Sequence, residues 1–211
     1  MKRKGVVEYG PRAYDLFMWP MELLWFGRWR RRVLSEVRGN VLDIGSGTGT
    51  NFKYYPKTVK CVTVIDPSEA NLRRLQERAG DNGWGSDGGR CLKIVIGVGE
   101  RLPFRSGSFD YVVSTLILCS VEDPAKVISE GVRVLKRGGR FVFIEHQRPR
   151  MGVQGVLFDA VTPAWRRMSG CNLNRRTEEE IIRNSGLRKV DTKRWGVLTG
   201  YPFLAAVFEK V

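Results

Sequence analysis

A glycine-rich turn beside a carboxylate is the clearest chemical feature of the sequence. Asp43 is followed by Gly45, Gly47 and Gly49 within the run VLDIGSGTGTN, residues 41–51. Glycine permits unusual backbone angles and lets a ligand approach the chain closely. A carboxylate beside such a turn suits a ligand that carries an ammonium group. We therefore expect a cofactor here, with Asp43 meeting its amino group directly or through water. The expected contacts within this run are Asp43, Gly45, Ser46, Gly47, Thr48, Gly49 and Asn51.

The glycine spacing separates two classes of cofactor. Dinucleotide sites favour G-x-G-x-x-G, which would place the third glycine at position 50, where this chain has Thr50. The third glycine instead falls at Gly49, giving G-x-G-x-G. S-adenosylmethionine (SAM) has no pyrophosphate to cradle and carries a cationic sulfonium, so the pattern favours SAM. A nicotinamide or flavin enzyme and a plain strand–turn–helix remain the alternatives.

A second carboxylate ends the next apolar run, VTVID. Asp66 lies 21 residues after Gly45 and is followed by Pro67. This is about the offset at which an acidic residue accepts hydrogen bonds from ribose hydroxyls. We expect Asp66 and Pro67 to border the ribose. The alternative is a strand-end acid that caps the following helix.

Three further segments are expected at the same edge of the sheet. The run GVGERLPF should cover the adenine, with Gly99, Glu100 and Arg101 as contacts, unless it is only a structural turn. The end of the fourth expected strand should line the methionine end, where the alternative is ordinary core. His146 follows the fifth strand and could accept a proton near neutral pH, or simply anchor the next segment. The residues expected at the methionine end are Ser114, Thr115 and Leu116.

The elements that must position these residues alternate between helix and strand, a pattern typical of a parallel α/β sheet. We expect a packed insert over 151–174. The predicted strands are 41–44, 60–65, 91–96, 109–114, 141–144, 187–195 and 201–208. The predicted helices are 14–34 with an interruption at Pro20, a helix reaching 55, then 69–78, 124–135 and 177–186.

The ordered set of motifs resembles a known family. The runs VLDIGSGTG, VIDPS, GERLPFRSGSFDYVVST and RVLKRGGRFVFIEH are similar to the ubiquinone/menaquinone C-methyltransferase-like group (methyltransferase type 11) of class I methyltransferases. The runs GTGTNFKYYP, VGERL, TLILCSVEDPAKV, IEH and SGCNLNRRT are similar to a branch that includes membrane-associated thiol S-methyltransferases. Two departures stand out: Val98 occupies a position where the group usually has Asp, and no N-terminal apolar anchor is visible.

The resemblance implies a Rossmann-like class I methyltransferase fold: a mostly parallel seven-stranded sheet, helices on both faces and an antiparallel last strand. It implies one domain, with an N-terminal helical cap (1–38), a SAM-binding core (39–150), a lid insert (151–176) and a C-terminal helix with strands (177–211). The implied reaction is methyl transfer from SAM, leaving S-adenosylhomocysteine, to a small hydrophobic acceptor: a quinone precursor, a thiol or a lipid head group. An NAD(P)-dependent oxidoreductase and a non-catalytic SAM- or nucleic-acid-binding protein are the alternatives.

The net charge of +14 is the main oddity of the composition. It suits anionic lipid, an acidic substrate, nucleic acid or simply a solvated surface. Nucleic acid is disfavoured because TLIL replaces the Asn/Asp-Pro-Pro-aromatic tetrad that many nucleic-acid amino-methyltransferases carry. Without a long apolar stretch or a signal peptide, we expect a cytoplasmic protein, with peripheral contact between residues 17–32 and an anionic membrane as the alternative. The sequence predicts no oligomeric state.

The four cysteines are scattered, and no Cys/His spacing indicates a metal site. We expect buried free thiols and no bound metal. Cys61 and Cys91 both fall in predicted strands, which makes a disulfide between them the less favoured alternative.

Overall fold

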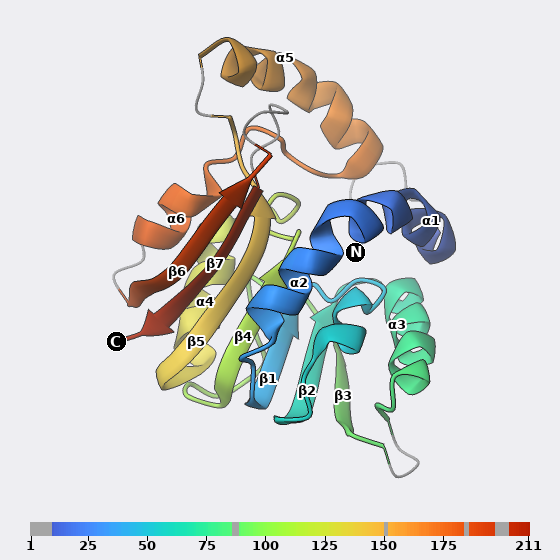
Figure 1. Ribbon diagram of the computed structural model, residues 1–211. Coiled ribbons are helices and arrows are strands. Elements are labelled where there is room, and N and C mark those ends of the chain that lie inside the picture. Colours follow the sequence, from blue (N-terminus) through green and yellow to red (C-terminus); the bar gives the residue numbers. More distant parts are fainter. Residues whose placement is uncertain (1–9, 86–88, 150–151, 184–185, 197–202) are drawn as a thin grey trace.

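A computed structural model describes residues 10–85, 89–149, 152–183, 186–196 and 203–211. Within these residues, seven strands form one sheet in the order β3-β2-β1-β4-β5-β7-β6 (Figure 1). The strands are β1 (Gly39–Ile44), β2 (Val59–Asp66), β3 (Cys91–Ile96), β4 (Phe109–Thr115), β5 (Leu135–His146), β6 (Leu187–Trp195) and β7 (Phe203–Lys210).

The sheet is parallel from β3 to β5, and β7 runs antiparallel to both β5 and β6. The chain first builds outward from β1 to β3 and then returns to place β4 on the other side of β1. The strand order therefore reverses between β1 and β4. In open α/β sheets, ligands bind at such a reversal, outside the carboxyl ends of the strands. The predicted fold class is confirmed.

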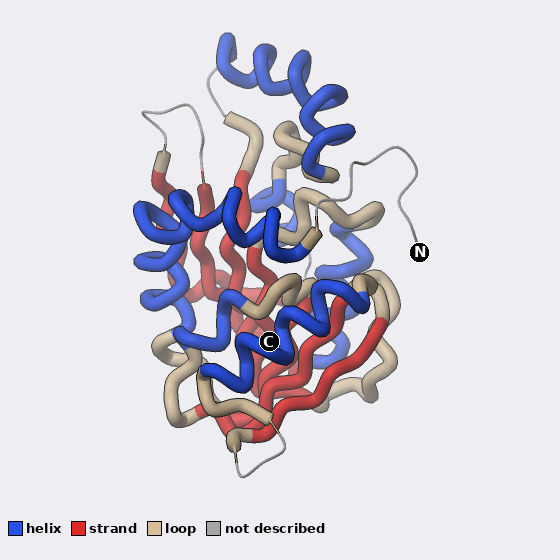
Figure 2. Tube along the Cα trace, turned by 90° about the vertical axis from the view of Figure 1, so that its right-hand side faces the viewer, coloured by secondary structure: helices blue, strands red, loops and turns tan. Residues whose placement is uncertain are grey.

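Helices cover both faces of the sheet, and each face has its own apolar core. On one face, Leu34 of α2 (Gly27–Leu34) and Leu75 of α3 (Glu69–Asp81) pack with Val41 and Val62. On the other, Ile128 of α4 (Pro124–Val134) and Ile181 of α6 (Thr177–Arg183) pack with residues that include Leu42 and Phe143. Helix α5 (Gly152–Ser169) lies beyond the edge of the sheet, at the top of both views (Figures 1 and 2).

The N-terminal helix is interrupted close to the predicted position. Pro20 lies inside α1 (Pro11–Met21), which continues through a π-helical turn, η1 (Glu22–Phe26), into α2. Proline has no backbone N–H and cannot complete the usual ladder, and a π turn is one way in which a helix absorbs such a defect. The break therefore begins two residues after Pro20.

Two predicted elements differ most from the structure. The helix expected after the glycine turn is only a 3₁₀ turn, η2 (Thr50–Tyr54), and β5 begins at Leu135 instead of residue 141. Residues 150–151, 184–185 and 201–202, which belong to predicted elements or to the expected core and lid boundaries, lie outside the described residues. Among the described helices, none is both long enough and apolar enough to cross a membrane.

The expectation of four free thiols is wrong. Cys61 and Cys91 are directly opposed on the neighbouring strands β2 and β3 and form a disulfide. Cys119 and Cys171 are free, the first buried and the second half-buried. The parallel register explains the pairing, since it aligns two positions that lie 30 residues apart in the sequence.

Candidate active site

The glycine turn takes a backbone course that requires its glycines. Gly45, Gly47 and Gly49 have φ values of 63°, 53° and 80°, in the left-handed region. A Cβ atom on Gly45 would lie only 1.6 Å from Cδ1 of Ile117. The turn therefore presents bare backbone at the carboxyl end of β1, where the sequence predicts the cofactor.

Asp43 is buried directly behind this turn. Its Oδ2 accepts hydrogen bonds from Asn51 Nδ2 at 2.9 Å and from the Tyr55 hydroxyl at 2.8 Å. Its Oδ1 has no hydrogen-bond partner among the described residues. Burial raises the pKa of Asp43 to about 6, although Asn51, Tyr55 and the charge of Arg30 lower it in part. An acceptor atom is thus held in the interior with nothing to bind, as a cofactor ammonium group requires.

Arg30 of α2 is a site residue that the sequence analysis missed. It is 5% exposed, and its Nη1 donates to Asn51 Oδ1 and, at 2.9 Å, to Thr115 Oγ1. Its Nε donates to Glu22 at 3.1 Å. The only sequence signal is its spacing from Phe26 and Val33, which places it on the buried face of the helix.

Asp66 joins the second strand to the glycine turn. Its Oδ2 accepts from the Gly47 amide at 3.0 Å, and its Oδ1 accepts from the Ser68 amide at 2.9 Å. Ser68 itself caps α3 by accepting from the Asn71 amide. The two carboxylates of the predicted site therefore flank one turn, on neighbouring parallel strands.

The turn after β3 packs against the end of β1 and the loop after β4. Gly99 is packed so tightly that an added Cβ would lie 2.9 Å from Ile44 Cγ2. Glu100 accepts a hydrogen bond from the Glu122 amide at 3.1 Å, so it contacts the loop after β4. Val98 is 40% exposed and presents an apolar side chain at this edge.

A narrow cleft of about 60 Å³ follows the glycine turn. Helix α1 closes over it, because Thr48 Oγ1 donates to Asp15 at 2.6 Å and Asp15 is also paired with Arg74 and Arg78. The predicted residues that line the cleft are Gly45, Ser46, Gly47, Thr48, Asn51, Thr115 and Leu116, joined by Tyr14, Arg30 and Thr50, which were not predicted as cofactor contacts. The predicted residues outside its lining are Asp43, Gly49, Asp66, Pro67, Gly99, Glu100, Arg101, Ser114 and His146.

The carboxylate of Glu145 holds the loop after β4 in place. The buried carboxylate accepts from the amides of Ile117 and Leu118, both at 2.9 Å, and from Ser114 Oγ at 3.3 Å. Burial raises the pKa of Glu145 to about 7. Leu116, at the start of this loop, has φ of 59°, a strained value for a residue with a side chain. Such strain at a cleft indicates a backbone shaped for function.

The fold brings His146 to two cysteines that the sequence did not connect with it. His146 Nε2 lies 2.7 Å from Cys171 Sγ, and both lie within 4.8 Å of Cys119 Sγ. Tyr14 lies near enough to Cys119, Cys171 and Arg30 to interact with them electrostatically, and it also lines the cleft. The side chains of Cys119, His146 and Cys171 therefore lie beside the methionine end of the predicted cofactor site.

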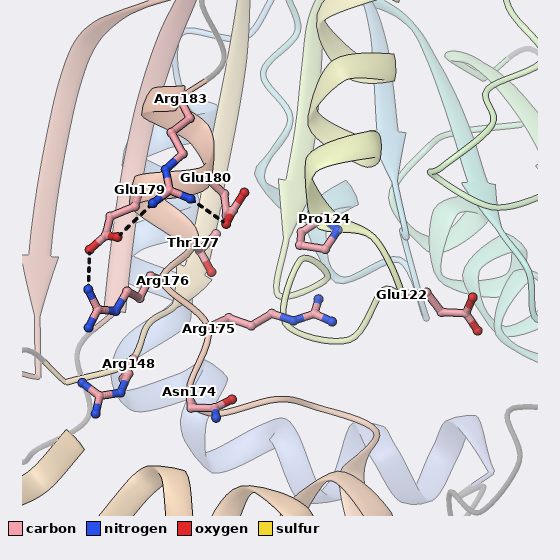
Figure 3. A pocket seen from close by; sticks show the side chains of 10 residues that line it. All are labelled: Glu122, Pro124, Arg148, Asn174, Arg175, Arg176, Thr177, Glu179, Glu180 and Arg183. Carbon is pink, nitrogen blue, oxygen red and sulfur yellow. Dashed lines mark hydrogen bonds and ion pairs between the residues drawn. The ribbon is translucent and has the colours of Figure 1, made fainter. Parts of the chain in front are cut away.

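A larger hollow of about 520 Å³ lies elsewhere, between α6 and the start of α4 (Figure 3). Its acidic and basic side chains largely neutralise one another: Arg183 contacts Glu179 and Glu180, and Arg176 contacts Glu179. None of the predicted site residues lines it.

Comparisons with known proteins point to one family. A family model for a methyltransferase domain matches residues 42–143. The thiol S-methyltransferase TMT1B of Rattus norvegicus is 37% identical over 166 residues, which cover 72% of this chain and 65% of that protein. The chain thus spans just under two thirds of this relative's length.

Two further comparisons agree. The demethylmenaquinone methyltransferase of Renibacterium salmoninarum is 33% identical over 59% of this chain and 50% of its own. The crystal structure of the YcgJ protein of Bacillus subtilis superposes with a TM-score of 0.71 at 18% identity, covering 87% of this chain and 98% of that one, and so supports the fold. Together with the glycine turn and its two flanking carboxylates, these matches show that the chain belongs to the class I SAM-dependent methyltransferases.

Proposed function

We propose that this protein transfers a methyl group from SAM to the sulfur of a small hydrophobic thiol. The observation that carries the proposal is that Tyr14, which lines the cleft along the glycine turn, also lies near Cys119 and Cys171, and Cys171 contacts His146 at the end of β5. The similarity to a thiol S-methyltransferase over 72% of the chain supports a thiol as the acceptor. A quinone precursor and a lipid head group are the alternatives.

The residues present fit SAM. Asp43 Oδ1, which accepts no hydrogen bond from the described residues, suits its ammonium group, and the buried Arg30 guanidinium suits its carboxylate. Asp66, beside Pro67, would accept from the ribose hydroxyls, and the turn from Gly99 to Arg101 would cover the adenine. Because Val98 is apolar, backbone groups or Glu100 would meet the adenine edge.

When bound, SAM supplies an already activated methyl group, so the main task of the chain is to position the acceptor. Ser114, Thr115 and Leu116 would set the methionine end through the strained backbone after β4. His146 would take the proton of the thiol, which must be lost for sulfur to attack. The described parts of the cap, residues 10–38, and of the lid, residues 152–176, would lie over the acceptor and exclude water.

We also propose peripheral contact with an anionic membrane. The cap carries exposed apolar side chains next to exposed arginines such as Arg28, Arg31 and Arg32. A surface of this composition suits the interface of a bilayer with acidic head groups. The exposed apolar side chains are Leu16, Phe17, Trp19, Leu23, Leu24 and Trp25.

The test is a direct assay for methylated sulfur. The purified chain is incubated with SAM and a small aromatic thiol such as thiophenol, and methyl thioether and S-adenosylhomocysteine are measured together by mass spectrometry. We expect the two products in equal amounts. In a parallel titration, Arg30→Met should weaken SAM binding at least tenfold, with circular dichroism confirming its fold. Consumption of SAM with a quinol but with no thiol would overturn the choice of acceptor.

A further inference from the structure

The cluster of Cys119, His146 and Cys171 has the composition of a metal site. It offers two sulfur atoms and one imidazole nitrogen, all within 4.8 Å of one another. Cys119 and His146 are 3% and 5% exposed, and Cys171 is half-buried. Sulfur and imidazole together are the preferred donors of Zn²⁺.

We propose that Cys119 Sγ, His146 Nε2 and Cys171 Sγ bind a Zn²⁺ ion, and that its fourth coordination position takes the sulfur of the acceptor thiol. The identity of the acceptor in this inference rests on the proposed function, whereas the metal site itself does not. Three protein ligands with an open fourth position are the usual arrangement of a catalytic zinc, and two cysteines with one histidine are among the known sets.

The three ligands come from separate segments, and each segment is held in place by other contacts. The carbonyl of Cys119 accepts from both the backbone amide and the side chain of Asn172, at 2.8 and 2.9 Å. Arg175 donates to the carbonyls of Leu118 and Val121. These bonds tie the loop after β4 to the loop that carries Cys171, so the donor atoms stay together without a metal.

The distances between the three donor atoms need only a small change to fit a tetrahedral Zn²⁺ ion. Bond lengths near 2.3 Å to sulfur and 2.0 Å to nitrogen place tetrahedral ligands about 3.5 to 3.8 Å apart. His146 Nε2 and Cys171 Sγ, now 2.7 Å apart, would separate by about 1 Å. Cys171 is the less buried of the two cysteines and lies in a loop after α5, where such a shift is easy.

The location gives the metal a role in the reaction. Tyr14 interacts with Cys119 and Cys171 and lines the cleft in which the methionine end of SAM is expected. A thiol bound to Zn²⁺ loses its proton to water and attacks as the thiolate. Its lone pair forms the new carbon–sulfur bond, while the methyl–sulfonium bond breaks and its electron pair stays on the sulfur of S-adenosylhomocysteine. In this arrangement His146 is a ligand and no longer the base.

Titration with metal ions, without SAM or thiol, tests whether the proposed metal site exists. The full chain, with Cys61→Ser and Cys91→Ser to remove the other two cysteines, is titrated with Co²⁺ under argon and then with Zn²⁺. We expect one ion per chain, a thiolate-to-cobalt charge-transfer band and the visible bands of tetrahedral cobalt. Cys119→Ser, Cys171→Ser and His146→Ala should each weaken binding at least tenfold. Failure to bind, or binding that survives Cys119→Ser, would overturn the site.

Adding thiophenol to the cobalt protein tests the fourth position. We expect the visible bands to shift on thiol binding, and chelation of the metal to lower thiol methylation at least tenfold. Unchanged bands, or full methylation after chelation, would overturn the role of the metal while leaving the proposed function intact. A metal site that forms with no methylation of any thiol would instead overturn the proposed function.

Discussion

At the scale of single residues, the site depends on a carboxylate kept where it is poorly solvated. Asp43 is 1% exposed, and burial raises its pKa from 3.8 to about 6. Relative to its ionised form, the protonated Asp43 contributes about 3 kcal/mol of stability, which is fully present below pH 3.8 and is lost as pH rises through 6. An ammonium group bound at Oδ1 would offset that loss. Cofactor binding would therefore relieve the destabilisation that the buried Asp43 carboxylate causes in the free protein.

This coupling predicts a pH-dependent affinity. Between pH 7 and pH 5 the Asp43 carboxylate becomes protonated, so S-adenosylhomocysteine should bind about tenfold more weakly at pH 5. Arg30 from α2, Tyr55 and Asp66 are the other charged or titratable groups acting on it. Isothermal titration calorimetry across this range gives the measurement. Asp43→Asn should bind weakly at every pH, and a variant that keeps the wild-type pH profile would contradict the assignment.

Other residues of the site show where sequence reasoning stops. Asp43 and Gly45 could be predicted because their chemistry lies within one short run. Arg30 could not, because its partner Thr115 lies 85 positions away and three other arginines lie within two residues of it in the sequence. The cysteine–histidine cluster is equally invisible, since its members are more than 20 residues apart and meet only through the ends of β4 and β5 and the loop after α5.

At the scale of elements, hydrophobic pattern determined most of what could be predicted. β3 and the beginning of α3 fall where the pattern places them, because each is a short, strongly apolar or amphipathic run with clear turn residues around it. The early start of β5 could not be predicted, because residues 135–140 are mostly polar or glycine and pair only because β4 lies alongside.

The β2–β3 disulfide is an element-scale feature with a measurable effect. It joins edge strand β3 to the sheet and closes a loop of about 30 residues. Constraining the unfolded chain in this way stabilises a protein by about 3 to 4 kcal/mol. The double variant Cys61→Ser, Cys91→Ser should therefore melt roughly 6 to 15 °C lower in non-reducing calorimetry.

A reductant provides the internal control for that comparison. Dithiothreitol should lower the melting temperature of the parent chain toward that of the variant and leave the variant itself unchanged. Equal melting temperatures without reductant would show that the disulfide does not restrain the unfolded chain. Cys119 and Cys171 are present in both proteins, so their oxidation cannot produce the difference.

At the scale of the whole molecule, positive charge and exposed apolar surface occur together around the cap. The chain carries a net charge of +14, and Phe17, Leu23 and Leu24 are all more than 60% exposed. An apolar acceptor would partition into lipid, so a cleft closed by a lipid-contacting cap could take it from the bilayer. The charge supplies attraction at a distance, and the apolar side chains supply insertion.

Flotation with vesicles separates these two contributions. The chain should float with vesicles rich in phosphatidylserine at low salt, bind several-fold less as salt rises to about 0.5 M, and ignore phosphatidylcholine vesicles. Leu23→Ser with Leu24→Ser should weaken binding at least tenfold, since two apolar side chains no longer leave water. Val190→Ser, at an exposed position on edge strand β6, is the matched control and should bind like the parent. If the double variant floats as well as the parent, charge alone holds the protein and the cap does not insert.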